Sequence, residues 1–132
     1  MNERYSIEKI EMFLAQKVKE LGVVDYVFEG HRPNAVEESI KTFAVVKVAT
    51  SLHDLNTHGV CICTIQYFVK TLRMGIKNSR KMNSVYANLT KLFPVQSEDY
   101  IFLSRPRIIP LGVDKEGYTV NAIEIDTLIK SI

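Results

Sequence analysis

Residues 60–71 read VCICTIQYFVKT and form the longest strand-like run in the sequence. Every second residue from Cys61 to Val69 is apolar, whereas Thr64, Gln66 and Lys70 belong to the intervening set. Successive side chains of a β-strand point to opposite faces of the sheet, so this alternation predicts a strand with one face against the core.

The preceding run, TFAVVKVAT at residues 42–50, is rich in β-branched side chains and nearly apolar on both faces. Such a run is typical of a central strand that is covered on both sides. The polar connection Ser51–Gly59 is too short for a crossover. The two strands should therefore form an antiparallel hairpin.

Apolar residues at helical spacing predict one amphipathic helix at Ile7–Leu21 and a second that closes with Met82–Phe93. Ser6 is a good N-cap for the first helix, and Gly22 supplies a left-handed stop after it. The charged residues of this helix, Glu11 among them, are expected to face water.

Three further strand-like runs are expected, at Val23–Glu29, Tyr100–Ile109 and Tyr118–Asp126. Proline cannot donate to a strand ladder, so Pro106 and Pro110 place the second of these at a sheet edge or make it short. An apolar tail, Leu128–Ile132, follows the last strand.

These elements predict an α+β fold with a mixed or mostly antiparallel sheet of about five strands and two packed helices, in the order α-β-β-β-α-β-β. At 132 residues the chain is large enough for one core and too small for two. We therefore expect a single domain over residues 1–132. Apolar residues on both faces of the central strand, the tail and the spare Met12 favour self-association.

Charge and hydropathy narrow the classes of function. The formal net charge is +2, with Lys and Arg scattered among nearly as many carboxylates, which disfavours a dedicated nucleic-acid binder. The basic run Arg73–Lys81 is the exception, and it keeps a nucleic-acid-associated or regulatory binding domain as the alternative. No apolar run reaches the roughly 20 residues of a membrane span, and the N-terminus has no signal-peptide block. We expect a cytoplasmic protein.

One cluster in the sequence combines residue types that can ligate a metal ion: His53, Asp54, His58, Cys61 and Cys63. Zinc requires four converging ligands, whereas here the histidines fall in a loop and the cysteines share the face of a strand. The two cysteines lie two residues apart on that strand, at the far limit for a disulfide. We predict two buried thiols and no metal or cofactor.

Catalysis is also disfavoured. A cysteine nucleophile needs a histidine held beside a thiolate, and a thiol buried in a strand is inert. Glu37 and Glu38 are adjacent in an expected loop, and the glycines stand alone, so neither paired carboxylates nor a phosphate loop is indicated. A small enzyme that uses Cys61 or Cys63 with a histidine is the third hypothesis.

The order of elements resembles the tail-terminator (tail-completion) proteins of long-tailed bacteriophages. The opening helix is followed by VFEGHRP at residues 27–33, an acidic loop and FAVVKV at residues 43–48. A long strand that ends in IQYFV at residues 65–69 precedes a helix that closes on LFP at residues 92–94. The resemblance spans nearly the whole chain and depends on hydrophobic pattern and element order.

This resemblance implies a non-enzymatic protein that forms a hexameric ring, caps the finished tail tube and joins it to the head connector. A head–tail joining protein of the same broad fold is a further alternative. The implied partners are other copies of the chain and the tail-tube and head-connector proteins. No membrane is involved, and nucleic acid is met only incidentally in a channel. The implied location is the bacterial cytoplasm during assembly and then the virion tail.

In that family, hairpin loops meet neighbouring proteins. By position these would be Ser51–Gly59 and Asp114–Gly117 here, and a small positive spot lies on the expected edge strand. The candidate residues for oligomer or partner contacts are His53, Asp54, Asn56, His58, Arg105 and Arg107.

Overall fold

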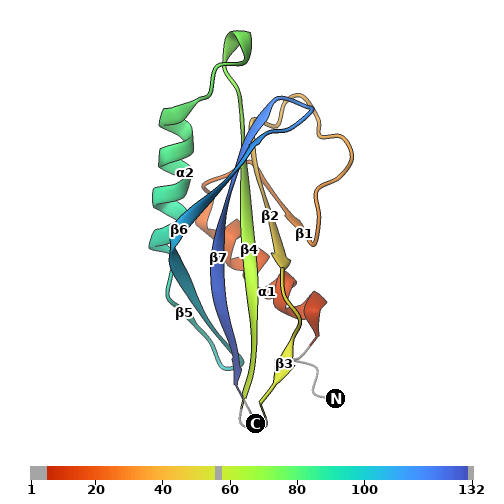
Figure 1. Cartoon of the computed structure of the whole chain (residues 1–132), viewed down its shortest axis with the longest axis vertical. Coiled ribbons are helices and arrows are strands. Elements are labelled where there is room, and N and C mark those ends of the chain that lie inside the picture. Colours follow the sequence, from red (N-terminus) through yellow and green to blue (C-terminus); the bar gives the residue numbers. More distant parts are fainter. Residues whose placement is uncertain (1–5, 56–57, 131–132) are drawn as a thin grey trace.

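The fold, seen in a computed structural model that describes residues 6–55 and 58–130, is a curled sheet with helices packed on it (Figure 1). Two α-helices, a short 3-10 helix at Arg73–Gly75 and seven strands are present in this part of the chain. The bounds of the α-helices and strands are α1 Ile7–Leu21, β1 Tyr26–Glu29, β2 Thr42–Val48, β3 His53–Asp54, β4 His58–Lys70, α2 Ser79–Lys91, β5 Val95–Gln96, β6 Tyr100–Val113 and β7 Tyr118–Lys130.

The strand order is β1-β2-β4-β7-β6-β5, with β3 paired to the start of β4. The predicted α+β class is confirmed, and so is the antiparallel pairing of β2 with β4. Two short strands, β3 and β5, were not predicted. The pairing of β1 with β2 is parallel, because the long connection between them returns to the start of the sheet (Figure 1).

The first helix begins and ends where the sequence predicts. Ser6 Oγ accepts a hydrogen bond from the backbone N–H of Lys9, and Gly22 adopts φ 69° at the C-terminal end. The expectation that Glu11 faces water is wrong. Its side chain is buried against the sheet, where its carboxylate accepts a hydrogen bond from Val48 N–H.

One face of the sheet packs against both helices. Alternate residues of β4, among them Cys63 and Ile65, meet Leu14 of α1 and Val85 and Leu89 of α2 in one buried cluster. In Figure 1, α1 passes behind β2 and β4, and α2 runs beside β6. The alternation predicted for residues 60–71 is thus confirmed.

The other face of the sheet is covered only at one end. There Phe43, Phe68 and Tyr118 form a second cluster, in which the rings of Phe43 and Phe68 stack with centroids 4.2 Å apart. The β1–β2 connection covers this cluster with Val36 and Ile40. Both faces of β2 are covered, as predicted. Its apolar side chains therefore pack within the chain itself and are not available for self-association.

The apolar tail was predicted wrongly for its described part, because β7 continues through Leu128 and Ile129 to Lys130. Ile129 is fully buried. Ile132 lies outside the described residues. The described part of the tail therefore completes the sheet. Leu128 nevertheless stays half-buried on the other face, and Met12 stays exposed.

Beyond Phe102, no described strand pairs with the outer edge of β6, so the predicted edge position is confirmed. This edge carries Pro106 and Pro110, and its register with β7 shifts after Ser104 and again after Pro110. Missing N–H groups and bulges are devices that prevent edge-to-edge pairing. The edge of β6 is poorly suited to add a further strand.

Candidate interaction surfaces

The uncovered end of the second sheet face forms an apolar hollow of about 590 Å³. Its floor is made by residues of three neighbouring strands: Val60 and Ile62 of β4, Leu128 of β7, and Ile101 and Leu103 of β6. Strand pairing brings them together, since Leu128 lies opposite both Val60 and Ile101. These positions alternate with the core positions of the same strands, so this end of the second sheet face is apolar as well.

Charged side chains border the hollow on β6 and β7. Arg105 Nε donates to the Asp126 carboxylate at 3.0 and 3.2 Å, and this hydrogen bond raises the pKa of Arg105. Glu124 Oε1 lies 3.6 Å from Arg105 Nη1 and 3.0 Å from Arg107 Nε. That oxygen is buried and its two contacts lack hydrogen-bond geometry, so they are ion pairs.

Of the predicted contact residues, the hollow brings together His53 and Arg105. His53 lies in β3, exposed, with Nε2 at 3.3 Å from Ser51 Oγ. His58 begins β4 opposite Lys130 and is half-buried. The backbone of Asp54 pairs with Gly59, whereas its side chain lies outside what the structure describes.

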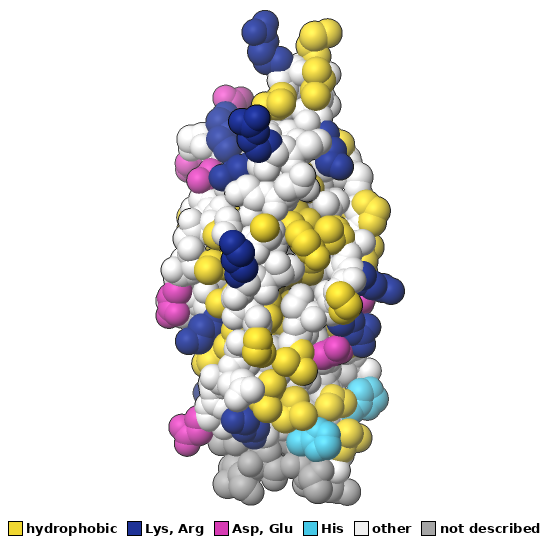
Figure 2. Space-filling view, turned by 90° about the vertical axis from the view of Figure 1, so that its left-hand side faces the viewer, with side chains coloured by type: hydrophobic (Ala, Val, Ile, Leu, Met, Phe, Trp, Pro, Cys, Tyr) yellow, Lys and Arg dark blue, Asp and Glu magenta, His cyan; other side chains and the backbone are white. Residues whose placement is uncertain are grey.

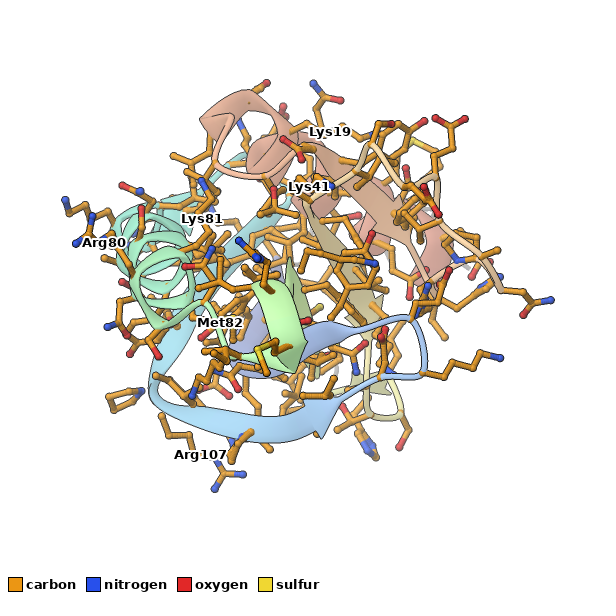
Figure 3. The ribbon with its side chains drawn as sticks, turned by 90° about the horizontal axis from the view of Figure 1, so that it is seen from above. Lys19, Lys41, Arg80, Lys81, Met82 and Arg107 are labelled. Carbon is orange, nitrogen blue, oxygen red and sulfur yellow. The ribbon has the colours of Figure 1, made fainter. Side chains whose placement is uncertain are left out.

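Asn56 also lies outside the described residues. Arg107 lies on the same strand as Arg105 but points outward when the molecule is viewed from the end that carries α2's first turn (Figure 3). Its side chain is 63% exposed, so its pairing with Glu124 is a surface contact. Sequence reasoning placed Arg105 and Arg107 on an edge strand correctly and missed their carboxylate partners on β7.

The predicted pair of buried thiols is confirmed: Cys61 and Cys63 are both buried and free of a disulfide. Thr127 Oγ1 donates a hydrogen bond to Cys63 Sγ at 3.2 Å. The contact with Cys61 and the burial both raise the pKa of Cys63 far above its ordinary value. Within residues 6–55 and 58–130, no group of three or more His, Cys, Asp or Glu side chains is placed to hold a metal ion.

A second uncovered apolar surface lies at the opposite end of the molecule, on the connection between β4 and α2. Leu72, Met74 and Ile76 are exposed there, and Met74 is 97% exposed. Leu72 N–H donates to Ile76 C=O at 2.6 Å and closes the turn. We call residues 72–76 the tip, which projects beyond the rest of the fold (Figures 1 and 2). The sequence predicted only a loop around Gly75 here.

The tip and α2 carry charge of one sign. No Asp or Glu occurs between Lys70 and Ser97, and the cations in that segment are Lys70, Arg73, Lys77, Arg80, Lys81 and Lys91. Lys81 and Lys41 line a cavity of about 360 Å³ together with Leu72. Figure 3 looks down on this end and shows Arg80 projecting from α2 into solvent.

The second predicted partner loop, Asp114–Gly117, is engaged within the chain. Arg32 forms ion pairs with both Asp114 and Glu116, and its guanidinium lies 5.3 Å from the ring centroid of Phe43. Glu116 also accepts a hydrogen bond from Val36 N–H, the main reason that the pKa of Glu116 is lowered. These contacts fasten the β1–β2 connection to the β6–β7 turn.

No described helix is both long and apolar enough to cross a membrane. A scan of the chain against protein-family models gives no match, and a search of curated proteins finds no relative.

Proposed function

We propose that this chain is a structural assembly protein of a phage or prophage tail, which forms an oligomeric ring that caps the tail tube and joins it to the head connector. The observation that carries the proposal is the pair of uncovered apolar surfaces, the hollow and the tip, on a fold with the expected order of elements. Exposed apolar patches on an otherwise well-packed domain are typical of protein–protein contacts.

The proposed mechanism is termination by capping. Copies of the chain bind one another and the end of the tube, and so block further addition of tube subunits. Edge strands and loops were the expected contacts, but the prolines of the β6 edge favour contacts through side chains. Neighbouring subunits and the tube would then bind the open face of the sheet and the loops at its ends, without backbone pairing between strands.

Multi-angle light scattering across a concentration range tests this proposal, with negative-stain electron microscopy of the largest species. We expect a defined oligomer with a central opening, or a monomer that assembles into one as concentration rises. A strict monomer with no rings at the highest attainable concentration would count against the proposal. The matched buffer series should include physiological salt, because surface charge contacts weaken with ionic strength.

A nucleic-acid-associated function is the second candidate, favoured by the absence of carboxylates between Lys70 and Ser97. Retention on duplex and single-stranded DNA over a salt gradient separates the two functions. A tail protein should elute below physiological salt. A nucleic-acid binder should elute above it, and Arg80→Ala with Lys81→Ala should reduce the dependence of its affinity on salt.

A further inference from the structure

The tip and the hollow have opposite shapes and lie at opposite ends of the same sheet. The tip follows Lys70, the last residue of β4, whereas Ile62 of the same strand contributes to the floor of the hollow. At about 3.4 Å per residue of antiparallel strand, the two positions are separated by about 27 Å. One copy therefore cannot fill its own hollow with its own tip.

We infer that the tip of one copy of this chain inserts Met74 into the hollow of a second copy, in a head-to-tail contact between identical subunits. The inference rests on the proposed function and adds the contact that would build the ring. A head-to-tail contact gives a closed ring when the rotation from one subunit to the next adds up to a full turn. The tip and the hollow are thus the two halves of one interface between copies of this chain.

The chemistry of the two surfaces matches. The floor of the hollow is apolar, and Leu103 in it is 49% exposed. Met74 offers an unbranched, adaptable side chain that fills irregular apolar spaces well. The tip is already closed by the hydrogen bond between Leu72 and Ile76, so little backbone freedom is lost on docking.

Charge gives the contact an orientation. Arg73 lies between Leu72 and Met74, and Lys77 follows Ile76, in a segment without carboxylates. Asp126 borders the hollow, and its side chain remains 49% exposed although it already pairs with Arg105. A carboxylate has two oxygens with about four acceptor sites, so Asp126 can take a second cation from the incoming tip.

The backbone of the tip supports a role beyond chain connection. Met74 has a φ of 63°, and Gly75, which follows it, also has a positive φ. Only the second of these two positions is occupied by the residue type that adopts positive φ without steric cost. Non-glycine residues in this region are uncommon, and strained positions concentrate at functional sites. The Met74 side chain is 97% exposed at the apex of the turn, so it contributes nothing to the core of its own subunit.

Sedimentation velocity of the full-length chain over a wide concentration range tests the inference with two variants. Met74→Asp removes the apolar apex while keeping a residue type that tolerates positive φ. Leu103→Arg places a cation in the hollow. We expect each to raise the concentration needed for association by on the order of tenfold or more, the effect of removing a central interface anchor.

Two matched controls should leave association unchanged. Leu111→Arg alters another leucine of β6 that is also 49% exposed, and Val113→Asp alters an exposed apolar residue at the end of the same strand. Circular dichroism of each variant verifies that its fold is retained. If the controls were as defective as the test variants, the effect would be general destabilisation, and the assignment of the two surfaces would be overturned.

The decisive step mixes two variants, each defective on one side of the contact. Met74→Asn, which brings no charge to meet the introduced arginine, keeps an intact hollow and Leu103→Arg keeps an intact tip, so an equimolar mixture should form heterodimers and stop there. A wild-type chain that stays monomeric, or variants that assemble normally, would overturn the inference. Rings that persist in both variants would leave the proposed function standing, whereas variant-sensitive assembly without rings would refute the tail function alone.

Discussion

Glu11 Oε2, in the second turn of α1, accepts a hydrogen bond of 2.9 Å from the backbone N–H of Val48, at the end of β2. The pairing of β1 with β2 ends at Glu29 and Val46. The Glu11 carboxylate thus occupies the place that a longer β1 would have filled beside Val48. It connects the helix to the sheet through a polar contact inside an otherwise apolar layer.

Removing this carboxylate should destabilise the protein. Glu11→Ala leaves the Val48 N–H without its partner, and a buried unsatisfied donor costs about 1–3 kcal/mol. Glu11→Gln retains an acceptor oxygen and should lose less. Urea unfolding followed by circular dichroism measures both. A Glu11→Ala variant as stable as the wild type would show that water replaces the carboxylate.

Arg32 should be the charged residue most important for stability. Its ion pairs with Asp114 and Glu116 are largely shielded, and its guanidinium also lies over Phe43. We expect Arg32→Ala to lower the free energy of unfolding by about 2–3 kcal/mol, and Arg32→Lys to lower it by less, because lysine keeps the charge but lacks the planar fork. The measurement is urea unfolding at neutral pH.

The control for this loss is Lys19→Ala. Lys19 and Glu29 are 3.8 Å apart, with side chains 45% and 37% exposed, so their pair should contribute no more than about 0.5 kcal/mol. Equal losses from Arg32→Ala and Lys19→Ala would mean that the cluster around Arg32 does not fasten the two loops together.

Stability should fall in acid through Glu116. The Val36 N–H and Arg32 lower the pKa of Glu116 from its ordinary value near 4.5, so the unfolded chain binds a proton before the folded chain does. This contribution is complete above about pH 4.5 and is lost as the pH falls through the lower, folded value. Unfolding free energies measured from pH 6 to 3 should decline less in Glu116→Gln.

The Cys63 thiol should resist modification in the folded protein, whereas its hydrogen bond with Cys61 lowers the pKa of Cys61. Cys63 is completely buried and its pKa is raised, so almost no thiolate forms at neutral pH. Ellman's reagent should therefore react with Cys63 at a rate limited by opening of the fold, and quickly after denaturation. Rapid reaction of both thiols in the native protein would instead favour the hypothesis of a cysteine-dependent enzyme.

Periodicity predicted the elements that bury one face along a long run. The bounds of α1 and the alternation along β4 followed directly, because both depend on neighbours in the sequence. The burial of Glu11 did not follow, since a carboxylate on the apolar side of a helix is explained only by an N–H from a distant strand. Likewise, β7 extends to Lys130 because β4 and β6 are present to pair with it.

The candidate surfaces were less predictable than the fold. Arg105 and Arg107 were singled out as cations on an edge, but their pairing with Glu124 and Asp126 depends on the register of β6 and β7. The tip gave one sequence clue, three apolar residues in a short loop between Thr71 and Lys77. Their exposure depends on how far the loop projects, which periodicity does not report.

Replacing Met74 should stabilise the folded protein, whereas most substitutions destabilise it. A left-handed conformation costs a non-glycine residue about 1–2 kcal/mol, and asparagine adopts it more readily than methionine does. Met74→Asn should therefore raise the free energy of unfolding, by about 0.5–1 kcal/mol, while it weakens self-association. Met12→Asn is the control, because asparagine is the poorer helix former and should lower stability slightly within α1. Urea unfolding at a concentration below the onset of association separates the two effects. If Met74→Asn were less stable than the wild type, the methionine would be held at φ 63° by packing within its own subunit, and the tip would be a structural turn.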